Sequence, residues 1–152
     1  MHAQTETQRE TALRPWKLLL LAGDLVALFL FVLVGQMDHD LLPGANPLWF
    51  TLARGWPFLL VWLVVGWLAG AFRLPAGATG WPLLRDLGGR ALHGWLIAAP
   101  LGVVLRALVL GRSVIPALFF LTTLGFGALF LLAWRLLFGL AYRFAGGSEP
   151  AH

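Results

Sequence analysis

The chain has 152 residues, of which 59% are hydrophobic and only 12% are charged, and its mean hydropathy is +0.80. A soluble domain carries about 25% charged residues, so this composition excludes a water-soluble protein and indicates one that lies in a lipid bilayer. The net charge of +4 comes from basic residues near the ends of apolar runs. Lipid headgroups explain that distribution, so we expect no nucleic-acid partner.

Four apolar segments predict an all-α integral membrane protein, with a four-transmembrane-helix bundle in one domain over residues 16–143. A polar cytoplasmic tail at 1–15 precedes this domain, and a short tail at 144–152 follows it. The apolar core of the first segment is too long for a typical signal peptide, so we expect it to remain as an anchor. The predicted spans cover about 16–37, 56–72, 92–110 and 114–142.

The segments between the spans are rich in glycine and proline, which predicts loops. The first loop covers Asp38–Arg54, and the second covers Arg73–Arg90 with one interfacial helical turn at Trp81–Leu87. The linker Gly111–Ser113 is so short that the last two spans should form a tight antiparallel hairpin. Ser113 is a residue type that caps helices, so we expect it to cap the fourth span.

Positive charges flank the spans unevenly. Two arginines, Arg54 and Arg112, lie on one side, and two more lie within the spans. Seven basic residues lie on the opposite side: Arg9, Arg14, Lys17, Arg73, Arg85, Arg90 and Arg143. The positive-inside rule therefore predicts a multi-pass protein of the cytoplasmic membrane with both termini in the cytoplasm.

Asp24 lies inside the apolar run of the first span, where a carboxylate is costly. At about 1.5 Å per residue, Asp24 lies roughly 10 Å into the hydrocarbon from the cytoplasmic face. Arg135 of the fourth span lies near that same cytoplasmic face of the membrane. Helical side chains lean toward the helix N-terminus, so these two lean toward each other, which predicts an Asp24–Arg135 ion pair.

Each member of this pair has an alternative interpretation. Arg135 could extend to the nearby headgroups, and Asp24 could be a neutral, hydrogen-bonded acid. Small residues at Gly125 and Ala128, on the face that Arg135 shares, favour a protein-facing arginine because they permit close helix packing.

Arg106 is a second intramembrane arginine, about one turn from the outer end of the third span. Gln36, Asp38 and Asp40 end the first span on the same side, so one of them is the expected partner. For Arg106 we expect a structural brace rather than an anion-binding role.

No motif for catalysis, a cofactor or a metal stands out. Asp38, His39 and Asp40 have metal-ligating side chains, but adjacent residues point in different directions. His93 lacks a second intramembrane histidine for a bis-histidine haem site, and no hydroxyl residue has a histidine partner. We therefore expect no enzyme, no cofactor and no metal site.

Short motifs follow the same order as the spans. They are Gly23-Asp24, Trp62-x-x-x-Gly66, Pro100-x-Gly102-x-x-x-Arg106, Gly111-Arg112 and Trp134-Arg135. Together they resemble the domain of unknown function 3054 family, small bacterial and archaeal membrane proteins with four predicted spans. The resemblance covers roughly residues 16–138, implies an integral membrane fold and brings no established activity.

Two functional hypotheses remain from these features. The first is a structural or accessory membrane protein in which the buried charges fix how the helices pack. The alternative is a small oligomeric transporter or channel that uses Asp24 as a proton- or cation-coupling site. The bilayer is the expected environment, and a homo-oligomer, a membrane partner protein and the substrate all stay open.

Overall fold

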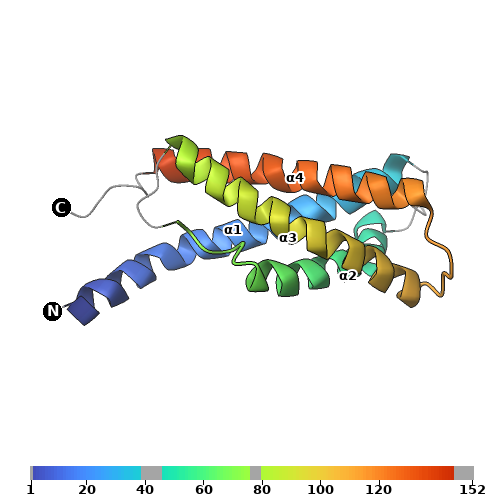
Figure 1. The fold of residues 1–152 in the computed structure, drawn as a ribbon, viewed down its shortest axis with the longest axis horizontal. Coiled ribbons are helices and arrows are strands. Elements are labelled where there is room, and N and C mark those ends of the chain that lie inside the picture. The colour runs from blue at the N-terminus through green and yellow to red at the C-terminus, as the bar shows by residue number, and fades with distance from the viewer. Residues whose placement is uncertain (1, 39–45, 76–79, 146–152) are drawn as a thin grey trace.

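The computed structural model describes residues 2–38, 46–75 and 80–145, with side chains of α1 described from Leu13 to Met37. All regular structure in these ranges is helical (Figure 1). The four helices are α1 (His2–Asp38), α2 (Pro47–Leu68), α3 (Gly80–Val109) and α4 (Ala117–Phe144). Each contains a stretch long and apolar enough to cross a bilayer, which confirms the predicted all-α membrane fold with four spans.

The helices form an up-and-down bundle. Figure 1 shows α1 and α3 running in one direction and α2 and α4 in the other, so α1 begins and α4 ends at the same end of the bundle. Each helix packs against the next one in sequence, and α4 also packs against α1. In the described residues the backbones of α1 and α3 do not come close together, so these helices occupy diagonal corners of the bundle and touch only through side chains such as Phe31 and Trp95.

The second helix begins earlier than the predicted span. The side chain of Asn46 accepts a hydrogen bond from the backbone nitrogen of Trp49 at 3.1 Å, and Pro47 opens the helix at a position that needs no N–H donor. The prediction that the loop extends to Arg54 is therefore wrong. Asn46 and Pro47, whose residue types favour a loop, are in fact the capping signal that starts α2, and this helix ends at Leu68 rather than near residue 72.

The third helix also begins early, at Gly80, so Trp81–Leu87 is its first part rather than a separate interfacial turn. Leu83 and Leu87, one helical turn apart, are both buried in a cluster with Leu20 and Phe138. This packing continues the helix through a stretch whose glycines and charges predicted a loop.

The hairpin between α3 and α4 forms as predicted, but its capping differs. Gly111 has φ of +62° and its N–H donates to Leu108, while the N–H of Arg112 donates to Ala107 at 2.8 Å. This pair of bonds is a Schellman motif, which ends α3 at a left-handed glycine. Helix α4 begins at Ala117 after Pro116, with no side-chain cap, so the predicted Ser113 cap is wrong.

Candidate functional site

Asp24 and Arg135 face each other at the α1–α4 contact. The Nε of Arg135 donates to Oδ1 of Asp24 at 3.0 Å, and Nη2 donates to Oδ2 at 2.5 Å. The exposed fraction is 0% for Asp24 and 1% for Arg135, so the pair is buried inside the bundle. The ion pair expected from depth and lean is present, and Arg135 does not extend to the headgroups.

Helix α2 and the turn after it each supply one further polar group to this pair. The indole Nε1 of Trp62 donates to Oδ2 of Asp24 at 3.2 Å. The remaining guanidinium nitrogen, Nη1 of Arg135, donates to the backbone carbonyl of Ala71 at 2.7 Å. We call Asp24, Trp62, Ala71 and Arg135 the charge clamp, because it joins α1, α4, α2 and the turn after α2.

The turn after α2 places the Ala71 carbonyl. Ala69 caps the helix, Gly70 has φ of +67°, and the N–H of Ala71 donates to the Gly66 carbonyl at 2.8 Å. The N–H of Gly70 donates to Trp67 at 3.1 Å, which completes a second Schellman motif. The reversal brings the Phe72 ring over Gly66, where an added Cβ would lie 2.8 Å from it.

We expect Gly70→Ala to lower stability by about 1–2 kcal/mol, the cost of a left-handed backbone for a residue with a Cβ. The measurement is unfolding in mixed micelles. Gly89→Ala is the control, because that helical glycine has no atom within 4 Å of an added Cβ. Equal stability of the two variants would contradict the conclusion that the left-handed backbone at position 70 requires glycine.

Two tryptophan–glycine contacts set the spacing of the helices around the clamp. The Trp134 ring lies on Gly23, where an added Cβ would be 2.0 Å away, and its Nε1 donates to the Leu20 carbonyl at 3.2 Å. The Trp95 ring lies on Gly127 in the same way, with its Nε1 donating to the Leu124 carbonyl at 3.0 Å. In both contacts the indole covers a glycine and donates to the carbonyl three residues before it.

Of the two small residues expected to pack α4, Ala128 packs against the core cluster and Gly125 does not. Gly125 is exposed, so the predicted packing role for it is wrong. The buried face that carries Arg135 instead includes Gly127 and Gly139, whose added Cβ atoms would meet Trp95 and Leu84. Glycine content alone does not tell a packed glycine from a lipid-facing one.

Arg106 lies apart from the charge clamp, near the α3–α4 hairpin. Its guanidinium carbon lies 4.8 Å from the ring centroid of Phe119, a cation–π contact. Among the side chains that the structure describes, none forms an ion pair with Arg106, and Gln36 does not hydrogen-bond to it. The other expected partners, the Asp38 side chain and Asp40, lie outside the described residues, as does His39.

The remaining polar candidates do not gather into a catalytic or metal-binding group. His93 is exposed on α3, with Nδ1 2.7 Å from the carbonyl of Gly89, and Asp86 pairs with Arg90 one turn along the same helix. Within residues 2–38, 46–75 and 80–145 no three side chains of metal-ligating type come together.

The sequence matches one known protein family. A family model described as a protein of unknown function, DUF3054, matches residues 21–138, most of the chain. The chain belongs to the DUF3054 family. The match includes Asp24, Arg106 and Arg135. No curated protein and no solved structure matches the chain.

The sequence of this DUF3054 chain indicates the two charges of the clamp, but it gives Trp62 only as part of a family motif and gives no sign of Ala71. The indole of Trp62 and the backbone carbonyl of Ala71 complete the bonding of the pair. A weak signal existed for Trp62, because Trp62 and Gly66 are one turn apart on the same helix face. The role of the Ala71 carbonyl cannot be predicted from a pattern of side chains, because every residue has a backbone carbonyl.

Proposed function

We propose that this DUF3054 protein is a structural or accessory protein of the cytoplasmic membrane, with the charge clamp as an internal brace and no catalytic role. The observation that carries the proposal is the complete bonding of Asp24. Both of its oxygens accept hydrogen bonds from Arg135, and Trp62 donates a third. A carboxylate held in this way fixes helix positions, whereas an ion-coupling site needs an acid that solvent can reach.

The cavities of the bundle support the same proposal. One of about 310 Å³ lies between α3 and α4 and is lined in part by Arg85 and Arg135. Another of about 560 Å³ lies near the α3–α4 hairpin. Asp24 lines neither of these two, and the first reaches only its partner Arg135.

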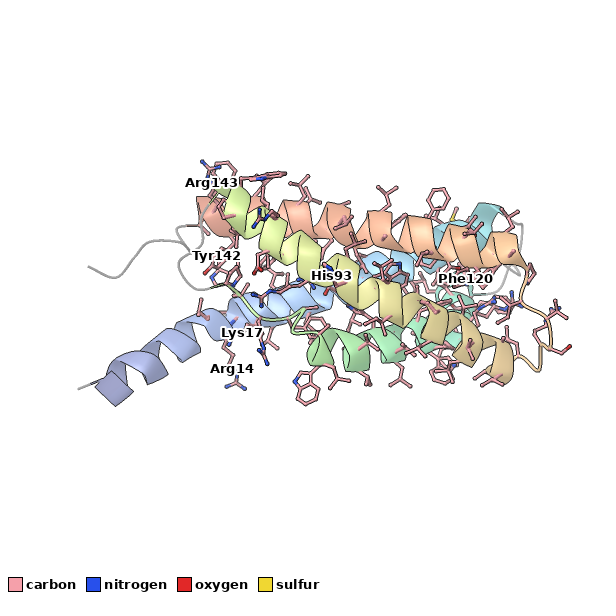
Figure 2. The ribbon with its side chains drawn as sticks, in the orientation of Figure 1. Arg14, Lys17, His93, Phe120, Tyr142 and Arg143 are labelled. Carbon is pink, nitrogen blue, oxygen red and sulfur yellow. The ribbon has the colours of Figure 1, made fainter. Side chains whose placement is uncertain are left out.

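The distribution of basic side chains supports both termini in the cytoplasm. Figure 2 shows Arg14, Lys17 and Arg143 near the end of the bundle where α1 begins and α4 ends. Phe120 lies toward the opposite end, near the hairpin. The positive-inside rule assigns the arginine- and lysine-rich end to the cytoplasm.

Proteoliposomes test the brace against the transporter alternative. We expect parent protein to give no proton, sodium or potassium flux above empty liposomes, and Asp24→Asn to lower thermal stability. Asp86→Asn is the control, because Asp86 pairs with Arg90 at a partly exposed site. A flux that Asp24→Asn abolishes while the variant remains folded, and that Asp86→Asn leaves intact, would establish the transporter instead.

A further inference from the structure

A cavity of about 560 Å³ lies at the hairpin end of the bundle, away from the charge clamp. Its walls come from all four helices, with Gln36 of α1 and Arg106 of α3 among the lining residues. The backbones of the diagonal helices α1 and α3 stay apart, and the cavity lies at the hairpin end of the space between them. Lining residues such as Val34 and Phe126 are exposed, so the cavity opens to the molecular surface. Its volume falls within the range of about 300–1,000 Å³ that small-molecule sites occupy.

Gln36 is the clearest sign that this cavity holds a ligand. Its side chain is only 5% exposed, yet neither its amide nitrogen nor its amide oxygen has a hydrogen-bond partner in the described residues. Buried amides are almost always bonded, because an unbonded one costs about 1–3 kcal/mol. Both amide atoms are themselves buried, so the side chain must turn toward the cavity before a group there that offers a donor and an acceptor can remove this cost.

Arginines give the cavity a positive charge that described carboxylates do not balance. Arg106 and Arg112 both line it, and Arg54 and Arg112 lie close enough to repel the charge on Arg106. The carboxylates whose side chains the structure describes belong to Asp24 and Asp86, and each is already paired with another arginine. The cavity therefore favours an anion.

The rest of the wall is apolar and aromatic. Five phenylalanines line the cavity: Phe31, Phe58, Phe119, Phe126 and Phe130. A small hydrated anion would gain nothing from these rings, whereas an alkyl or ring-bearing body would be buried against them. We propose that this cavity binds an amphiphile with an anionic head group, which Arg106 and Gln36 receive while the apolar body packs on the phenylalanines.

Native mass spectrometry of protein released from a neutral detergent tests this site with decyl phosphate as the probe. We expect one decyl phosphate per chain and no adduct with decanol, which has the same alkyl chain without the charge. Arg106→Gln should weaken binding about tenfold, the usual effect of losing a charged hydrogen bond. Arg143→Gln is the control, because Arg143 is exposed at the opposite end of the bundle.

Gln36→Leu separates binding from folding. Since the amide of Gln36 has no partner in the described residues, we expect this variant to unfold at the parent's temperature or above it, yet to bind decyl phosphate several-fold more weakly. Two arms then identify the source of the head group. Displacement of the probe by inorganic phosphate alone indicates a soluble anion without an apolar body, which would contradict the proposal. Displacement by phosphatidylglycerol but not phosphatidylcholine indicates a bilayer lipid.

Three further results would overturn the proposal. They are no saturable adduct with decyl phosphate, equal binding of decyl phosphate and decanol, and equal binding by the parent and Arg106→Gln. The brace is tested separately, because variants of the clamp do not touch the cavity and Arg106 makes no bond to the clamp.

Discussion

Replacement of Arg135 by leucine is expected to lower the free energy of unfolding by about 3–5 kcal/mol, the usual cost of leaving a buried charge without its partner. The variant strands the Asp24 carboxylate at 0% exposure and removes the donor to the Ala71 carbonyl. Unfolding in mixed micelles measures the loss. Arg85→Leu is the matched control, because Arg85 is exposed on α3, and we expect it to change stability by less than about 0.5 kcal/mol.

The double variant Asp24→Leu with Arg135→Leu separates the pair from its surroundings. Replacing both charges by apolar side chains is often close to neutral, so we expect it to recover a good part of the loss. Exchange of the two charges should not recover it, because a carboxylate at position 135 would then face the Ala71 carbonyl. A loss in Arg135→Leu no larger than that in Arg85→Leu would contradict the brace.

A methyl group at Gly127 is the second substitution with a large expected effect. Its Cβ would lie 2.1 Å from Cζ2 of Trp95, so either α4 or the indole must move. We expect Gly127→Ala to cost about 3 kcal/mol, the upper part of the range for overpacked cores. Adding Trp95→Phe removes the clashing ring atoms and should restore part of the stability, although the bond to the Leu124 carbonyl is lost.

Gly125→Ala provides the matched control two residues earlier in the same helix. No atom lies within 4 Å of a Cβ added there, so the substitution should be neutral or stabilise the helix by roughly 0.5–1 kcal/mol. Thermal unfolding of the two single variants under identical conditions makes the comparison. Similar melting temperatures for both would show that the α3–α4 contact adjusts freely.

The sequence was sufficient for the number of spans and for the Asp24–Arg135 pair, because both follow from one-dimensional quantities. Hydropathy counts the spans, and residue number converts to depth along a helix. The helix beginnings were less predictable. Asn46 and Pro47 break a helix when they lie inside it but start one when they lie at its first turn, and composition does not distinguish these positions.

The features that sequence could not supply depend on how helices face one another. Gly125 and Gly127 are the same residue type in the same helix, yet Gly125 is exposed and Gly127 lies under the Trp95 ring. The cavity near Arg106 exists because α1 and α3 stand at diagonal corners of the bundle. The rotation of each helix about its own axis decides which glycine is buried and where a cavity lies. The sequence indicates that rotation only weakly when the helices are apolar on most sides.

The separation of the clamp's charges along the chain has a consequence for biosynthesis. Asp24 emerges from the ribosome 111 positions before Arg135, so α1 reaches the membrane without its counter-charge. At that stage its acid must stay protonated or remain near the lipid surface. Arrival of the last helix supplies the counter-charge, and a nascent chain that stops before α4 keeps this acid without Arg135.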